Sequence, residues 1–172
     1  WSQVRVLGYY TIARNSERIA GTGYKNITEI KKRIVNYANE LIKDANKTAY
    51  KTVMYKKKAN FIWGSNSVAA NQGIALIQAY KITNDKKYLK YALDNLDYIL
   101  GRNGTGYSFV TGYGSKTPMH PHHRPSVADG IVDPVPGLIV GGPNPGDEDH
   151  IPLPSFIPDE AYIDNDQAYA SN

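Results

Sequence analysis

The chain of 172 residues contains no cysteine, so it forms no disulfide framework and carries no thiolate chemistry. It also lacks any run of about 18 apolar residues, so we expect no membrane-spanning helix. Within the given residues we recognise no segment with the pattern expected of a secretory signal peptide. Phenylalanine and tryptophan are scarce, at three and two residues, whereas tyrosine is abundant at fourteen. Tyrosine combines an apolar ring with a hydroxyl group, which suits sugar-binding clefts and also ordinary helix interfaces.

The charge of the chain gives little reason to expect a nucleic-acid partner. Lysine and arginine number 20 against 16 acidic residues, which leaves a net charge of +4. The densest basic run, Lys56 to Lys58, has no accompanying stripe of arginines. Because isolated basic runs are usually solvated surfaces, we interpret this one as a loop or helix face, and we predict no nucleic-acid partner.

Apolar periodicity predicts four helices in the first hundred residues. The first helix is expected at Ser2–Ala13 and the second at Asn26–Asn46. The third begins at Ser65 or Asn66. The fourth begins at Asn84 or Asp85 and stops at Gly101. Glycine and proline then dominate residues 102–158, where no period survives, and a further helix is expected from Asp164. Helices joined by short turns indicate an all-α architecture of paired helices, and a long irregular segment is normally functional.

The segment from Ser108 to Arg124, SFVTGYGSKTPMHPHHR, is the most informative of the chain. Its glycines allow tight turns beside a ligand, and an arginine offers several donors in one plane, which suits paired sugar hydroxyls. The histidines His120, His122 and His123 could instead be surface residues or metal ligands. A metal site is disfavoured because no carboxylate or cysteine stands at ligand spacing and adjacent histidine side chains diverge.

Two further motifs carry residues suited to a sugar site. In YIDNDQAYASN, from Tyr162 to Asn172, Asp164 could cap a helix and orient its neighbours. In WGSNS, from Trp63 to Ser67, the indole is placed to project into a cleft and stack on the apolar face of a sugar, although a buried tryptophan is the ordinary alternative.

Together these segments closely resemble the signature segments of family 9 glycoside hydrolases, the inverting cellulases. The strings WGSNS and PVPGLIVGGPNPG, the latter from Pro134 to Gly146, also resemble the family. The resemblance implies that residues 1–172 form the C-terminal part of an (α/α)6 barrel. It also implies that His122 and Asp164 belong to the active-site set. The residues implied to bind the sugar are Trp63, His123, Arg124 and Tyr169.

An inverting glycosidase needs two carboxyl groups about 6.5–9.5 Å apart, one acid and one base. In the resemblance the base belongs to a DAGD-type motif, which this sequence lacks, and the acid follows directly after Asn172. We therefore expect a parent enzyme that hydrolyses β-1,4-glucans, with the missing N-terminal part of the same catalytic domain as a partner. We expect the isolated chain to be inactive; the alternative is a non-catalytic glucan-binding or interaction fragment.

The resemblance has further implications for cofactors and location. No cofactor is required for the chemistry, and a structural calcium ion is found in the family. The family resemblance also implies a secreted, extracellular enzyme.

Overall fold

The computed structural model describes residues 4–54 and 58–172, and within them it is helical without any strand. One isolated antiparallel bridge joins Val110 and Ile139. The helices, including two short 3₁₀ turns, are α1 (Arg5–Arg14), α2 (Ser16–Ala20), α3 (Ile27–Ile42), η1 (Ala45–Lys47), η2 (Lys58–Asn60), α4 (Ser65–Thr83), α5 (Lys86–Ile99) and α6 (Arg124–Ala128). The all-α prediction is thus confirmed. Ser2, Lys56 and Lys57 lie outside the described residues.

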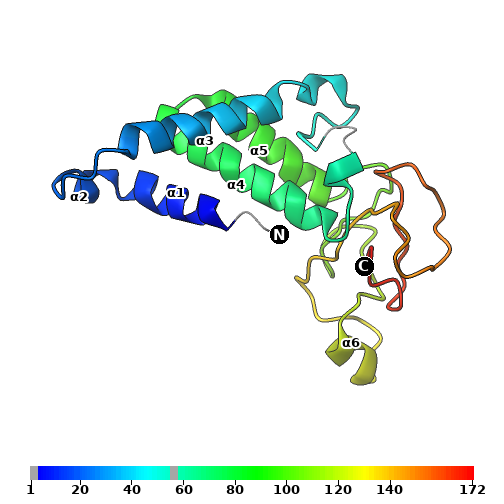
Figure 1. Ribbon diagram of the computed structural model, residues 1–172. Helices are drawn as coiled ribbons and strands as arrows, with labels where there is room; N and C mark the ends of the chain where they lie inside the picture. The colour runs from blue at the N-terminus through cyan, green and yellow to red at the C-terminus, as the bar shows by residue number, and fades with distance from the viewer. Residues whose placement is uncertain (1–3, 55–57) are drawn as a thin grey trace.

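Helix α4 is the centre of the helical half and packs between α3 and α5 (Figure 1). Its buried face is made of small residues, which let the neighbouring backbones approach closely. A Cβ added at Gly73 would lie 3.9 Å from the Ala92 carbonyl oxygen. Leu76 and Tyr88 are almost fully buried in the resulting apolar core. Burying a large apolar side chain contributes roughly 1.5–3 kcal/mol, so this core stabilises the packing of the helices.

Both predicted ends of α5 are confirmed by the backbone. The Asp85 side chain caps the helix by accepting a hydrogen bond from the Lys87 N–H at 2.9 Å. Gly101 follows the last residues with φ +119°, a conformation that favours glycine.

Other helix boundaries differ from the predictions. Asn26 occupies the N-cap position of α3 without a side-chain hydrogen bond, and α3 ends at Ile42. Gly64, in a left-handed conformation, precedes α4, while the Asn66 amide instead contacts a distant loop. The helices α2 and α6 were not predicted. Each is only five residues long, too short to show a period.

The helix predicted from Asp164 is wrong: residues 164–172 form turns. The prediction depended on the Asp164 carboxylate capping the N–H groups that follow it. In the structure the two carboxylate oxygens accept from Met119 and His120 instead. The same carboxylate can cap a helix or accept hydrogen bonds from a distant segment, and here it accepts from the distant segment.

The loops that follow α5 gather at one end of the helical half, and the C-terminus lies among them (Figure 1). They close around a second core in which Tyr98, Phe109 and Tyr162 are almost fully buried. The Phe109 and Tyr162 rings meet edge to face with their centroids 5.1 Å apart. Burial raises the pKa of Tyr98 and Tyr162, so both phenols stay neutral.

The loops are attached to the start of α4 by backbone contacts. The Asn66 N–H donates to the Gly141 carbonyl at 2.9 Å, and the Asn66 side-chain amide donates to the Val140 carbonyl at 2.9 Å. Gly142 in turn donates to the Ser171 carbonyl at 2.8 Å. The first turn of α4 therefore positions the last residues of the chain through the 140–142 loop.

Over the described ranges, none of the helices combines the length and the apolar character needed to cross a bilayer.

The hydrogen bonds of the Asp94 carboxylate make the stability of the chain sensitive to acid. Burial raises its pKa, but hydrogen bonds from Arg102 at 2.7 Å and Lys90 at 2.8 Å outweigh this and lower the pKa overall. Its stabilising contribution is therefore complete above the unfolded pKa of about 3.9 and is lost as the pH falls through the lower folded pKa. We expect Asp94→Asn to lower the free energy of unfolding by about 1 kcal/mol at pH 7, and by much less below about pH 3.

Urea unfolding followed by circular dichroism at both pH values measures this difference. Asp97→Asn is the control, because the Asp97 carboxylate is half exposed and its nearest cationic contact, to Arg102, is 3.4 Å. An equal loss for both variants at pH 7 would contradict the importance of the Asp94 contacts.

Gly142 provides a test of how the loops are attached to α4. Gly142 and Gly106 both have positive φ, +96° and +68°, so alanine strains either backbone. A Cβ at Gly106 meets nothing within 4 Å, whereas one at Gly142 would lie 2.5 Å from Asn66. We expect Gly142→Ala to be less stable than Gly106→Ala by about 1–3 kcal/mol, the usual range for overpacking. Thermal unfolding of both variants measures this difference in stability. Equal melting temperatures would refute the close packing of Gly142 on Asn66.

Candidate functional site

The two sequence motifs meet in space through Asp164. Its carboxylate accepts hydrogen bonds from the backbone N–H groups of Met119 at 2.8 Å and His120 at 2.9 Å. These partners lie 45 and 44 residues away along the chain. Bonds to an ionised acceptor are stronger than neutral ones, so this contact firmly joins the segment before His122 to the Tyr162–Asn172 segment.

His122 lies next to this junction and remains exposed. Its Nδ1 atom is 2.7 Å from the Asp166 carbonyl oxygen. A carbonyl oxygen only accepts, so Nδ1 carries the proton in this hydrogen bond and Nε2 is left for other partners. The hydrogen bond fixes the orientation of the ring, whose centroid is 6.1 Å from that of Tyr169.

Trp63 and Tyr169 are joined to each other and remain accessible. The Trp63 Nε1–H donates to the Tyr169 carbonyl oxygen at 2.6 Å, and the Tyr169 hydroxyl donates to the Glu148 carbonyl at 3.1 Å. The Trp63 and Tyr169 side chains are 54% and 44% exposed. Anchored aromatic rings that stay partly exposed are suited to stacking on sugars. The structure thus brings three predicted site residues, Trp63, His122 and Tyr169, to one place.

His123 and Arg124 begin the short helix α6. The His123 Nδ1 atom accepts from the Ser126 N–H and lies 2.9 Å from the Ser126 hydroxyl, so this ring caps the helix. The Arg124 side chain is exposed, and within the described residues it has no hydrogen bond or ion pair. Its five donors are therefore available to a ligand.

Asn172 belongs to this site, although no role was predicted for it. Its side-chain amide donates to the His120 carbonyl at 2.6 Å and to the Asn165 carbonyl at 3.1 Å, and its oxygen accepts from the Tyr162 hydroxyl at 3.3 Å. A small pocket of about 150 Å³ lies between it, the His122 loop and residues 138–141. The only sequence signal was its place directly before the expected acid.

Asp164 also influences the tyrosines around it. Burial raises the pKa of Tyr107, and the negative charge of Asp164 adds to that rise. The pKa of Tyr162 is raised by burial first and then by Asp164. Tyr162 consequently keeps its proton and remains a hydrogen-bond donor to Asn172.

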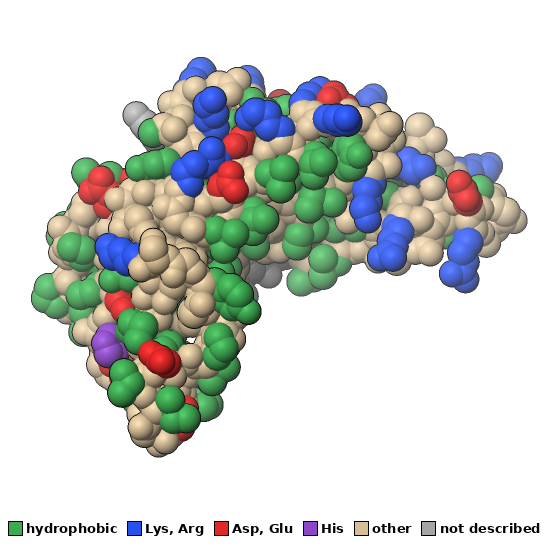
Figure 2. Space-filling model, turned by 180° about the vertical axis from the view of Figure 1, so that it is seen from behind, with side chains coloured by type: hydrophobic (Ala, Val, Ile, Leu, Met, Phe, Trp, Pro, Cys, Tyr) green, Lys and Arg blue, Asp and Glu red, His purple; other side chains and the backbone are tan. Residues whose placement is uncertain are grey.

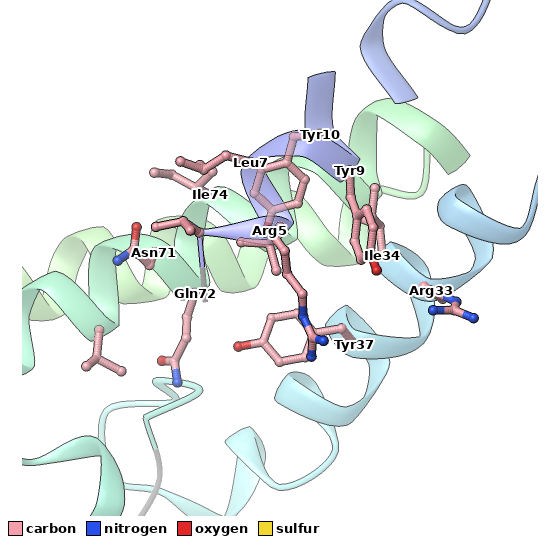
Figure 3. Close-up of a pocket in the computed structure, with 13 residues that line it drawn as sticks. Arg5, Leu7, Tyr9, Tyr10, Arg33, Ile34, Tyr37, Asn71, Gln72 and Ile74 are labelled. Atoms are coloured by element: carbon pink, nitrogen blue, oxygen red, sulfur yellow. The ribbon is translucent and has the colours of Figure 1, made fainter. Parts of the chain in front are cut away.

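A larger pocket of about 720 Å³ lies away from these residues, between α1, α3 and α4. In Figure 3 Leu7, Tyr10 and Ile74 lie together on one side of it, whereas Arg5 extends toward Tyr37. Several apolar side chains here are exposed, including Val4 at 70%, Leu7 at 59% and Ile74 at 43%. Hydrophobic side chains also gather in the angle between the helical and loop halves (Figure 2). Exposed apolar surface of this kind is typical of a face that contacts another part of a protein or a ligand.

The described parts of the chain contain no group of three or more His, Cys, Asp or Glu side chains arranged to hold a metal ion. Near the site, Asp149 accepts from the Ala170 N–H and Glu148 accepts from the Asn144 amide. We assign no step to a metal.

Comparisons with known proteins identify the family of the chain. The family model for glycosyl hydrolase family 9 matches residues 1–172. The chain is 39% identical over 173 residues to the xyloglucan-specific endo-beta-1,4-glucanase BoGH9A of Bacteroides ovatus, covering all of this chain and 30% of that protein. It is 34% identical to endoglucanase D of Acetivibrio thermocellus, covering 89% of this chain and 24% of that one.

Solved structures give the same result. A metagenome-derived family 9 endoglucanase superimposes with a TM-score of 0.82 at 31% identity, over 96% of this chain and 29% of that chain. The described residues are all-α, and the fold is part of an (α/α)6 barrel. The chain spans less than a third of the length of each of these relatives. Sequence and structure together place this chain in glycosyl hydrolase family 9.

Proposed function

We propose that this chain forms the sugar-binding and positioning side of an active site that hydrolyses β-1,4-glucosidic bonds in cellulose or related β-glucans with inversion. The observation that carries the proposal is the Asp164 carboxylate bound to the N–H groups of Met119 and His120. It brings His122 and Tyr169 together from distant segments, and Trp63 joins them through Tyr169.

Each side chain suits a separate task in such a site. The exposed rings of Trp63 and Tyr169 stack on pyranose faces, and the unpaired guanidinium of Arg124 grips adjacent hydroxyls. His122 presents Nε2 to the sugar with its ring held by Asp166. His123 adds a contact from Nε2, the ring nitrogen that does not cap α6. Asp164 shapes the loop on which the histidines stand.

The chemistry also needs two carboxyl groups that other parts of the catalytic domain provide. The acid protonates the glycosidic oxygen as the C–O bond breaks, while the base takes a proton from the water that attacks the sugar carbon from the opposite face. The exposed face of α1 and α4 packs against the N-terminal part of the same domain, which completes the barrel. The parent enzyme is secreted, as befits a polymeric substrate outside the cell.

Arg124→Lys tests the substrate-binding role within the complete catalytic domain. Lysine keeps the charge but loses the planar fork, so one charge-assisted hydrogen bond to the transition state is lost, worth about 1.5–3 kcal/mol. We expect kcat/KM on a soluble β-glucan to fall by about one to two decades. The melting temperature stays unchanged, because Arg124 is exposed and makes no ion pair with the described residues. A variant with full kcat/KM refutes the role; a lowered melting temperature identifies a structural strut instead.

An activity assay on the isolated chain distinguishes a fragment of an enzyme from an independent glucan-binding module. Without the partner carboxylates we expect no sugar release from carboxymethylcellulose, since losing general acid–base catalysis removes about 10²–10⁴-fold for each group. Reducing-sugar assays on the purified 19.1 kDa chain measure this. Activity that persists through further purification would contradict the expectation. Retention on insoluble cellulose, abolished by Trp63→Ala, would favour the alternative of a glucan-binding fragment.

A further inference from the structure

Asn172 connects three segments of the site through one side chain. The His120 carbonyl belongs to the loop that carries His122, the Asn165 carbonyl belongs to the turn after Asp164, and the Tyr162 hydroxyl comes from the second core. The residue is only 7% exposed, and both polar atoms of its side chain are engaged. A buried amide with all of its partners in place has one orientation.

The backbone of Asn172 is fixed as well. Its N–H donates to the Ala168 carbonyl at 2.8 Å, and the preceding residue is held where the Ser171 carbonyl accepts from Gly142. Close packing reinforces this, because a Cβ at Gly141 would lie 3.3 Å from the Ser171 carbonyl carbon. Whatever residue follows Asn172 thus starts from a backbone position with little freedom relative to the His122 loop.

We propose that Asn172 is a positioning residue, which sets the distance between the general acid and the sugar held by the His122 loop. The inference rests on the proposed function together with the family resemblance, which places the acid directly after Asn172. The hydrogen bond from Asn172 to the His120 carbonyl joins the end of that segment to the His122 loop. An acid displaced by about 1 Å loses much of its advantage, since such misplacement can reduce the rate by about 10²-fold.

The chemistry of the leaving group distinguishes acid positioning from general damage. A glucosyl or alkyl oxygen must be protonated as its bond breaks, so its departure depends on the acid. A 2,4-dinitrophenolate is stable without a proton and departs unaided. Loss of acid positioning therefore slows the first kind of substrate and spares the second, whereas a loss of folded enzyme or of sugar binding slows both.

The experiment compares Asn172→Ala with Asn103→Ala in the complete catalytic domain. Asn103 is a matched control, because it is 6% exposed and its amide also donates to two backbone carbonyls, those of Tyr98 and Tyr107. In the described chain its side chain hydrogen-bonds to Tyr98, Thr105, Gly106 and Tyr107, which are not among the site residues. The kcat and KM of each variant are measured on cellotetraose and on 2,4-dinitrophenyl β-cellobioside, well below both melting temperatures.

We expect Asn172→Ala to reduce kcat on cellotetraose by about 10- to 100-fold, with KM and the activity on the dinitrophenyl substrate nearly unchanged. Asn103→Ala lowers the melting temperature and leaves the ratio of the two activities as it was. Equal losses on both substrates, or no loss, for Asn172→Ala would overturn the inference.

Tyr162→Phe keeps the test decisive should Asn172→Ala not fold. It removes only the hydrogen bond to the Asn172 oxygen, so the same selective loss is expected at about 2- to 10-fold. A loss shared by both substrates would overturn the inference. If the unmodified domain releases sugar from neither substrate, the proposed function itself is wrong. If it is active and only the selectivity is missing, the proposed function stands without a role for Asn172.

Discussion

Two consecutive backbone N–H groups, those of Met119 and His120, share one carboxylate, and the arrangement of the site depends on that contact. Neither of the two segments that meet here belongs to a helix: Met119 and His120 lie in a Gly/Pro-rich loop, and Asp164 lies in an irregular stretch followed by turns. Joining the two through Asp164 closes a loop of 45 residues at an entropic cost that grows only slowly with its length. Once it is closed, His122 and Asn172 come within reach of partners on the opposite segment.

The helical half and the loop half are stabilised by different interactions. Around Leu76 the helices bury an apolar core, and their backbone groups are satisfied within each helix. The loop half has an aromatic core, but in the described chain its only sheet-like pairing is the Val110–Ile139 bridge. Single backbone–backbone hydrogen bonds, such as that from the Thr111 N–H to the Leu138 carbonyl, are supplemented there by side chains. The Thr111 hydroxyl, for example, donates to the Val135 carbonyl and accepts from the Leu138 N–H. Scattered single bonds of this kind take the place of a regular ladder in the irregular segment.

Local signals were sufficient for the helices and insufficient for the site. Asp85 and Gly101 were predicted because a cap and a stop depend on neighbouring residues only. The contact between Asp164 and the His122 loop has no local signal, since an aspartate accepts equally well from its own turn or from a distant one. The sequence therefore predicted a helix there, and only the family resemblance related the two motifs. Asn172 was missed for the same reason, because its partners lie up to 52 residues away.

The reliance of the loops on side-chain hydrogen bonds has a consequence for heat inactivation. A helix opens cooperatively against its core, but the His122 loop needs only the few bonds around Asp164 and Asn172 to break. Local opening of this kind requires less free energy than global unfolding. The site will therefore lose its geometry at temperatures where the helical signal in circular dichroism is still intact, and reversibly so while Leu76 and the residues around it remain packed. The temperature at which the site loses its geometry is therefore set by the irregular segments and lies below the temperature at which the helices unfold.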